Sequence, residues 1–197
     1  MPIYANIGEF LEFINISNDK FTLFEWKPLQ SFRRFDLDLN IVRKNKVNDI
    51  YFHKDKGNMK IVYIRKNDLI YTVGSSLEVQ FQLLEALIEH IDLKFNETYD
   101  VGVILSYGNF SPNIFIGFKA VIDGILRKFA KLDLVERIQV ECRVCNKILP
   151  LFVKKSYIKN AESYPVPIVY VHAGHAILCF IDKNFHHRGV ELVNITG

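Results

Sequence analysis

The chain has 197 residues, of which 49% are hydrophobic and 24% are charged. This composition supplies enough apolar side chains for one large or two small folded domains, and it excludes a chain that is disordered throughout. The net charge of +3 is too small to indicate a class of partner, and no uncharged apolar run approaches the roughly 18 residues that a membrane span needs.

The N-terminal residues and the cysteines indicate the compartment. Met1 is followed by no basic flank, and Glu9 and Glu12 interrupt the first apolar stretch, so neither a signal peptide nor a membrane anchor is expected. The three cysteines are an odd number, and two of them stand as Cys142-x-x-Cys145, which argues against a disulfide framework. We therefore predict a protein of a reducing compartment, the cytoplasm.

Short segments rich in β-branched and aromatic residues fill the first third of the chain. Residues 10–16 and 21–26 flank the turn composition of residues 17–20, which predicts a hairpin. Residues 35–41 alternate apolar and polar side chains with period two, which predicts a strand; at a sheet edge it could accept another chain. Further strands are predicted at 49–53, 59–65 and 69–73, and the short connections between them indicate an antiparallel sheet.

The period then changes to that of an α-helix. Apolar residues recur at steps of three and four between Leu77 and Phe95, which predicts an amphipathic helix of about five turns. Ser75 and Glu78 have the spacing of a capping box at its start, after Gly74 ends the preceding strand. The same periodicity predicts a buried pair and an exposed pair in mid-helix, which are Leu84 and Ile88 against Glu85 and Glu89.

A second helix is predicted from Ser111-Pro112 to Phe129, because serine caps helix ends and proline fits the first helical position. Residues 101–106 are short and apolar, and they fit either a buried strand or the start of a broken helix. Residues 128–137 are the best candidate for a domain boundary.

Beyond this boundary the pattern returns to strands, at 138–142, 148–153, 168–172, 176–181 and 189–193. The sequence therefore predicts an α+β protein with a first domain at 1–130 and a β-rich second domain at 138–197. The second domain is small for a core of its own, so it needs a metal or support from the first domain.

The order of elements over residues 8–130 resembles the longin or SNARE-like fold, and most of all the small chains of clathrin-adaptor complexes. The paired strands KIVYIR (60–65) and LIYTV (69–73) and the helix from Leu77 to Phe95 carry this resemblance. The family has a helix between its second and third strands, where this chain has the alternation of residues 35–41. The resemblance implies a non-enzymatic module that binds proteins, such as small GTPases or SNARE and coat components, at membrane surfaces. No binding residue is carried over.

Two pairs of potential metal ligands stand at predicted hairpin tips. Cys142 and Cys145 lie between two strands, and His172 and His175 lie between two others, which is the layout of a zinc ribbon with one tetrahedral ion. Asn146 follows the second cysteine, where a positive φ is often required. Other readings stay open, namely a ribbon without metal and a redox pair of cysteines. The rival ligands are Cys179, His186 and His187.

Basic residues suggest two further kinds of partner. Those of residues 33–66 could meet phosphates of a lipid surface or of nucleic acid, or form the solvated rim of a sheet. The residues of this segment that we single out are Arg33, Arg34, Arg43, Lys44 and Lys46. A second group beside the cysteines supports an alternative function, a nucleic-acid-associated zinc-ribbon protein. That group is Arg143, Lys147, Lys154, Lys155 and Lys159.

The sequence contains no phosphate loop, dinucleotide fingerprint or nucleophile elbow. The cluster of His186 and His187 with Asp182 resembles a hairpin turn more than an active site. We therefore expect a non-enzymatic protein–protein interaction or adaptor module, linked to small GTPases or to a membrane-associated assembly, and an oligomer is compatible with these features.

Overall fold

The computed structural model of the chain describes residues 4–28, 42, 44–106 and 112–193. The chain divides into two compact units, Met1–Leu132 and Asp133–Gly197, which we call the N-terminal unit and the C-terminal unit. The division falls inside residues 128–137. Both units contain antiparallel sheets, and the predicted α+β class is confirmed.

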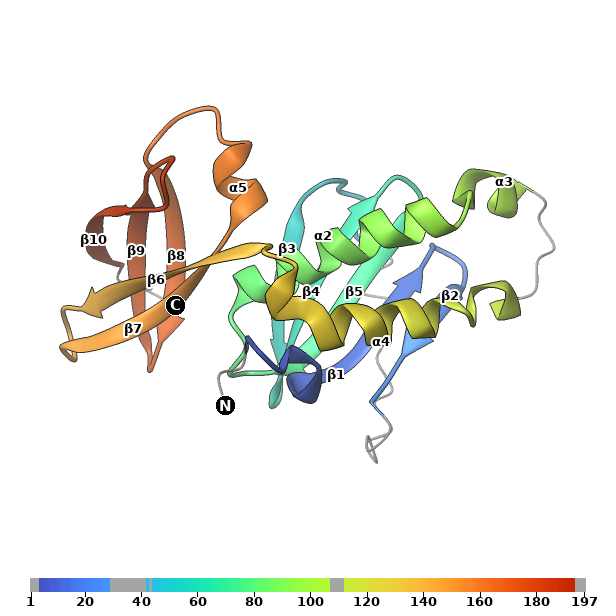
Figure 1. Cartoon of the computed structure of the whole chain (residues 1–197), viewed down its shortest axis with the longest axis horizontal. Helices are drawn as coiled ribbons and strands as arrows, with labels where there is room; N and C mark the ends of the chain where they lie inside the picture. The colour runs from blue at the N-terminus through green and yellow to red at the C-terminus, as the bar shows by residue number, and fades with distance from the viewer. Residues whose placement is uncertain (1–3, 29–41, 43, 107–111, 194–197) are drawn as a thin grey trace. The chain divides into compact units, whose positions relative to one another are not determined.

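A five-stranded antiparallel sheet in the order β2-β1-β5-β4-β3 forms the base of the N-terminal unit (Figure 1). The predicted hairpins at 10–26 and 59–73 are confirmed as β1–β2 and β4–β5. The turn of the first hairpin is closed by Asn18, whose Oδ1 accepts the N–H groups of Lys20 and Phe21, each at 2.9 Å. The strands are β1 (Leu11–Ser17), β2 (Thr22–Trp26), β3 (Tyr51–Lys56), β4 (Met59–Lys66) and β5 (Leu69–Ser76).

Helices follow the sheet in the chain and cover one of its faces (Figure 1). Helix α2 packs on β4 and β5, α4 packs on β2, and the two helices contact each other. The indole Nε1 of Trp26 on β2 donates to Asp123 Oδ1 on α4 at 2.8 Å. The helices are α2 (Phe81–Thr98), α3 (Val101–Ser106) and α4 (Phe118–Lys128), with 3-10 turns at Ile7–Phe10, Pro112–Phe115 and Phe129–Lys131.

Aromatic rings join the helices to the sheet in the core of this unit. The ring of Phe95 on α2 lies 4.9 Å from that of Phe118 and 5.3 Å from that of Phe115. The Tyr71 ring of β5 meets Phe95 edge-on at 6.4 Å between centroids. Phe95, Phe115 and Phe118 are all fully buried, so this aromatic cluster holds α2, α4 and the sheet together.

The predicted start of the long helix is wrong. Ser75 belongs to β5, which continues to Ser76, and α2 begins only at Phe81. Its N-cap residue is Gln80, whose side chain makes no capping hydrogen bond. Gly74 therefore lies within the strand instead of ending it. A β-carbon at Gly74 would lie 2.1 Å from Cε1 of Phe13, so the absence of a side chain lets the Phe13 ring pack there.

The predicted faces of α2 are confirmed in part. Leu84 and Ile88 are fully buried, as expected, and Glu89 is partly exposed. Glu85 is only 6% exposed, so the prediction that it faces water is wrong. The physical reason is its partner on strand β3, because Glu85 Oε1 lies 2.8 Å from His53 Nε2. The His53 ring also stacks on Phe81, with 4.1 Å between the ring centroids.

The remaining predictions for this unit meet three outcomes. Residues 101–106 form helix α3, which decides between the two expected forms. The second helix begins at Phe118, later than predicted, after a 3-10 turn at Pro112–Phe115, and Ser111 lies outside the described residues. The strand predicted at 35–41 also lies outside them. The neighbouring residues Val42 and Lys44 have helical backbone.

The C-terminal unit consists of two small antiparallel sheets, β6-β7 and β10-β9-β8. Each strand predicted beyond the boundary is confirmed. The hydroxyl of Tyr170 on β8 donates to the Phe152 carbonyl on β7 at 2.8 Å, which links the sheets. The elements are β6 (Val135–Cys142), β7 (Lys147–Lys154), α5 (Lys155–Lys159), β8 (Val166–His172), β9 (His175–Ile181) and β10 (His187–Val193).

The register of β8 and β9 divides their side chains between a core face and an exposed face. Ile168 opposes Cys179, and Tyr170 opposes Ile177, and all four are buried in the core of the unit. Val169 and its neighbours two residues away point to the other face. His172 and His175 are the next opposing pair on the core side, so the alternation brings both imidazoles to the end of the core.

Candidate metal centre

The first pair of potential ligands comes from the turn between β6 and β7. Cys142 is the last residue of β6 and is fully buried, whereas Cys145 is partly exposed. The turn is closed by a 2.7 Å hydrogen bond from the Asn146 N–H to the Cys142 carbonyl. Asn146 has φ 52°, which confirms the predicted positive φ and returns the chain into β7.

This turn also stabilises a thiolate. The backbone N–H of Cys145, followed by that of Val144, donates to the Cys142 sulfur and lowers the pKa of this thiol from 9.0 to about 7. Burial opposes this shift, while the His175 and Cys145 side chains support it. The thiolate is the form of cysteine that binds metal, so the turn favours a ligand at position 142.

The second pair comes from the two-residue turn between β8 and β9. Ala173 has φ 47° and Gly174 has φ 80°, and positive φ at both central residues is the signature of a type I′ turn. His172 and His175 flank this turn as directly opposing residues of the ladder. Opposing residues of an antiparallel pair project to the same face, so both imidazoles point toward the cysteines.

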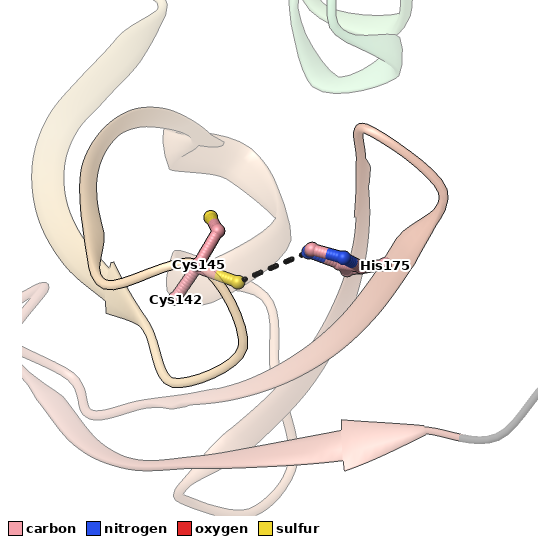
Figure 2. Close-up of side chains that lie close together, drawn as sticks. All are labelled: Cys142, Cys145 and His175. Atoms are coloured by element: carbon pink, nitrogen blue, oxygen red, sulfur yellow. Dashed lines mark hydrogen bonds between the residues drawn. The ribbon is translucent and has the colours of Figure 1, made fainter.

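The two hairpin tips meet through thiol–imidazole contacts. Cys142 Sγ lies 3.5 Å from His175 Nδ1, a contact drawn as a dashed line in Figure 2, and Cys145 Sγ lies 3.6 Å from His172 Nε2. The ligand atoms of Cys142, Cys145 and His175 all lie within 4.8 Å of one another, close enough to bind one metal ion. His172 adjoins this group of three through Cys145.

These distances fit the dimensions of a tetrahedral site. Metal–sulfur and metal–nitrogen bonds of about 2.3 and 2.1 Å at a tetrahedral angle place sulfur and nitrogen about 3.6 Å apart. The two measured separations, 3.5 and 3.6 Å, match the edge of such a tetrahedron. These two sulfur–nitrogen pairs therefore already stand at the separation that bound ligands would have.

The rival ligands lie elsewhere in the C-terminal unit. Within the described part of the chain, the group of three holds none of them. Cys179 is fully buried in the core, and burial raises the pKa of its thiol to about 11, which keeps it protonated. His186 lies in the β9–β10 connection and His187 begins β10; in this connection Asp182 Oδ1 accepts the N–H groups of Asn184 and His186 at 2.8 and 2.9 Å. That carboxylate shapes a turn.

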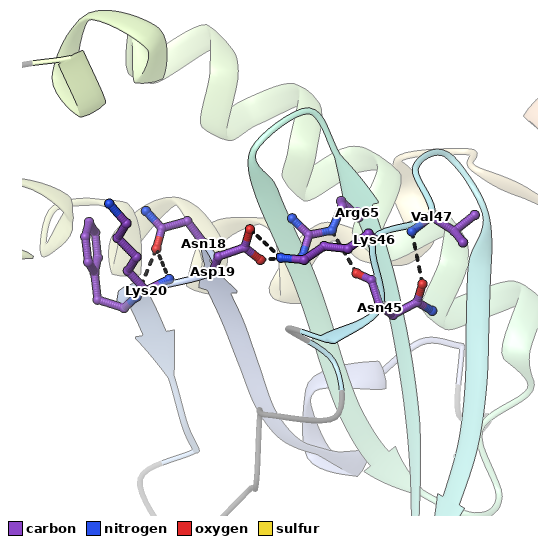
Figure 3. A network of polar contacts seen from close by, with 8 residues as sticks. Asn18, Asp19, Lys20, Asn45, Lys46, Val47 and Arg65 are labelled. Atoms are coloured by element: carbon purple, nitrogen blue, oxygen red, sulfur yellow. Dashed lines mark hydrogen bonds and ion pairs between the residues drawn. The ribbon is translucent and has the colours of Figure 1, made fainter.

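The basic segment of the N-terminal unit is tied to its own sheet. The Asp19 carboxylate accepts hydrogen bonds from Lys46 Nζ, at 2.7 Å, and from the guanidinium of the buried Arg65, at 2.6 Å; both contacts are drawn in Figure 3. Arg65 Nε also donates to the Asn45 carbonyl at 3.0 Å. Of the basic residues singled out in the sequence, Lys46 is therefore held by the sheet, and Lys44 is exposed. Arg33, Arg34 and Arg43 lie outside the described residues.

The second basic group divides into two parts. Lys155 is paired with Asp133 at 2.7 Å and with Glu136 at 3.2 Å, and Lys154 is buried. Arg143, Lys147 and Lys159 are exposed; Arg143 lies in the cysteine turn and Lys147 directly follows it. In the N-terminal unit, the sequence did not predict the contact of His53 with Glu85. A contact between an edge strand and a helix leaves no pattern in the local sequence that could predict it.

Comparison of the chain with protein-family models gives no match, and comparison with curated proteins gives none either. None of the helices described here combines the length and the hydropathy that crossing a bilayer requires.

Proposed function

We propose that this chain is a non-enzymatic interaction protein, with a longin-like N-terminal unit and a C-terminal unit that is held together by one structural zinc ion. The observation that carries the proposal is the meeting of two hairpin tips through Cys142–His175 and Cys145–His172, at 3.5 and 3.6 Å.

Zinc is the metal that this donor set favours. Thiolate and imidazole ligands suit zinc, whereas calcium and magnesium prefer oxygen ligands. Four protein ligands, Cys142, Cys145, His172 and His175, complete a tetrahedron and leave no position for a substrate, which is the usual form of a structural site. A closed site supports the non-enzymatic part of the proposal.

His172 would be the fourth ligand. Its Nε2 lies 3.6 Å from Cys145 Sγ, and its backbone is held opposite His175 by the ladder. The group whose ligand atoms all lie within 4.8 Å of one another does not include His172, so its ring would have to move to bind the same ion. A site with only three protein ligands would instead keep a water molecule, as catalytic zinc sites do.

The ion would link two parts that belong to separate sheets. Cys142 is the last residue of β6 and Cys145 lies in the turn that follows, whereas His172 and His175 flank the turn between β8 and β9. One ion would therefore fix both hairpins at the end of the core. A unit as small as Asp133–Gly197 buries little apolar surface for its length. Metal binding would therefore supply a substantial part of its folding free energy.

Cobalt(II) substitution tests the ligand set. We expect the full chain to bind one Co²⁺ with the intense visible bands of a tetrahedral site and the charge-transfer bands of thiolates. Cys142→Ser and Cys145→Ser should lose these bands, and His172→Ala should change the visible ones. The matched control is Cys179→Ala, which removes the third cysteine and should leave the spectrum unchanged. A weak octahedral spectrum, or equal losses in the control, would contradict the assignment.

Several features of the N-terminal unit support the adaptor part of the proposal. An antiparallel sheet followed in the chain by the two helices that pack on it, α2 and α4, fits the order that the longin resemblance implies; the short α3 lies between them. The helical backbone at Val42 and Lys44 lies between the second and third strands, where that family has a helix. Longin-like domains bind proteins, so we propose a small GTPase or a coat-like component as the partner of this unit.

The outer edge of β3 offers a route for a partner strand. In the described part of the sheet, β3 pairs with β4 alone, and Lys56 and Met59 flank its two-residue turn. Residues that flank such a turn hydrogen-bond to each other, so the N–H of Asp55 points to the free edge. The edge can therefore accept an added strand.

Binding to purified small GTPases, loaded with GDP or with a GTP analogue, tests this role. We expect nucleotide-dependent binding of the full chain that Asp55→Pro abolishes, because proline removes the outward donor and spares the ladder. The control Asp55→Ser keeps the N–H and should bind normally. Equal binding of all three proteins would exclude the β3 edge, and no binding to any GTPase would exclude this partner class.

A further inference from the structure

The β6–β7 turn and its flanks, residues 143–148, expose aliphatic and cationic side chains together; we call this segment the hairpin tip. Ile148 is 68% exposed, the largest value among the large hydrophobic side chains of the described residues, and Val144 is 49% exposed. Arg143 and Lys147 are exposed beside them. Exposed aliphatic residues that share one short hairpin with free cations are a candidate binding surface.

The two cations of the hairpin tip are available to an external anion. Within the described residues, neither the Arg143 guanidinium nor the Lys147 ammonium has a hydrogen-bond or ion-pair partner. Lys155 differs, because Asp133 and Glu136 already bind it. In the β6–β7 ladder the acidic residue nearest to these cations is Glu141. It lies on β6, outside the turn, and opposes Ile148 of β7.

The hairpin tip is held in one shape at its base. The Asn146 N–H donates to the Cys142 carbonyl at 2.7 Å, and the Cys145 side chain turns inward to its cluster with His175. The inference builds on the proposed zinc site, because the ion would further fix Cys145 between the outward-facing Val144 and Lys147, while the Asn146 hydrogen bond closes the turn by itself.

We propose that the hairpin tip docks on an anionic lipid bilayer. Val144 and Ile148 enter the interface, while Arg143 and Lys147 lie among the headgroups. Aliphatic side chains flanked by cations are what an anionic membrane surface binds, since apolar burial and electrostatic attraction then act together. The two exposed hydrophobic residues lie within five positions of each other, so they can enter the same interface.

Nucleic acid fits the same surface less well. Single-stranded nucleic acid is bound through aromatic side chains that stack on bases, and residues 143–148 contain no aromatic residue. Phosphates of a duplex would satisfy Arg143 and Lys147 but would leave Val144 and Ile148 in water. The aliphatic pair therefore favours lipid over nucleic acid.

Sedimentation of the full chain with vesicles tests the proposal. We expect binding to phosphatidylcholine vesicles that contain phosphatidylserine, no binding to phosphatidylcholine alone, and weaker binding as salt increases. Val144→Ser and Ile148→Ser should each weaken binding about tenfold, and Lys147→Glu should weaken it comparably. The matched controls should bind normally. They are Val169→Ser, at a valine that is 56% exposed on β8, and Lys183→Glu, at an exposed lysine.

The outcomes separate this proposal from the zinc site. Zinc content is measured on every sample, so a variant that loses its metal is recognised. A zinc-containing wild-type chain that ignores anionic vesicles overturns the membrane proposal and leaves the zinc site intact. Binding that Val169→Ser weakens as much as Val144→Ser also overturns it. So does binding to duplex or single-stranded DNA that exceeds binding to anionic vesicles. A chain without zinc that still binds vesicles through Ile148 refutes the metal site alone.

Discussion

Burial of single side chains on α2 separates residues that look alike in the sequence. Leu84 is fully buried against the sheet, whereas Leu93 on the same helix is 52% exposed. We predict that Leu84→Ala lowers the free energy of unfolding by about 2–5 kcal/mol, because it removes buried methyl groups and leaves a cavity. Leu93→Ala should change it by about 0.5 kcal/mol or less. Urea denaturation of the N-terminal unit measures both, and similar losses would contradict the assigned face.

The carboxyl of Asp19 gives a prediction about pH. Hydrogen bonds from Lys46 and then Arg65 lower the pKa of Asp19 from its ordinary 3.8. A group whose pKa falls on folding stabilises the protein above its unfolded pKa, and this contribution is lost as pH falls through the folded pKa. Asp19→Asn should therefore lower Tm by a few degrees at neutral pH, and this deficit should shrink as the pH falls through the acid range. Glu78→Gln, on an exposed side chain, is the control; a deficit for Asp19→Asn that persists in acid would contradict this account.

Glu85 shows what helical periodicity misses at this scale. The spacing of apolar residues located Leu84 and Ile88 correctly, because both face the sheet. It failed for Glu85, since burial there comes from His53, which is 32 positions away on a strand at the end of the sheet. A periodic pattern describes one helix face, whereas the second buried face is created by tertiary contact.

At the scale of elements, the type I′ turn of the histidine hairpin gives a paired prediction. Ala173 and Gly174 both have positive φ, which is strained for alanine and not for glycine. Ala173→Gly should raise the unfolding free energy of the C-terminal unit by about 0.5–1 kcal/mol, and Gly174→Ala should lower it by about 1 kcal/mol. No other atom lies within 4 Å of a β-carbon at Gly174, so a larger loss in denaturation would require a different cause.

The elements that the sequence predicted well are those with a strong local signal. The turns of the hairpins β4–β5 and β8–β9 were placed nearly to the residue, whereas β5 runs on to Ser76, beyond the predicted end at residue 73. The start of α2 was placed too early, because Ser75 and Glu78 match a capping box while pairing with β4 keeps Ser75 in the sheet. Cross-strand pairing overrode the local helix signal there.

The candidate site was predictable in composition and less so in geometry. Spacing alone selected Cys142, Cys145, His172 and His175 from several cysteines and histidines, because each pair flanks or occupies a tight turn. That Cys142 faces His175 and Cys145 faces His172 depends on how two separate sheets meet. No local pattern in the sequence specifies that meeting.

At the scale of the whole molecule, the two units should respond differently to loss of the metal. The N-terminal unit has a five-stranded sheet and its own aromatic core, whereas the C-terminal unit is small. We predict that a chelator, or Cys142→Ser, increases hydrogen exchange in residues 133–193 and leaves the N-terminal unit protected. Cys179→Ala without chelator should keep its protection. Equal loosening of both units would contradict a metal that acts only in the C-terminal one.

The most direct test of the account is the zinc content of the full chain. Elemental analysis of protein purified without chelator, combined with native mass spectrometry, gives the metal, its identity and the number of ions per chain. We predict one zinc per chain in the wild type and in Cys179→Ala, and a large loss in Cys142→Ser and Cys145→Ser. A wild-type chain that is folded, contains no zinc and takes up none when the ion is supplied would contradict the central claim.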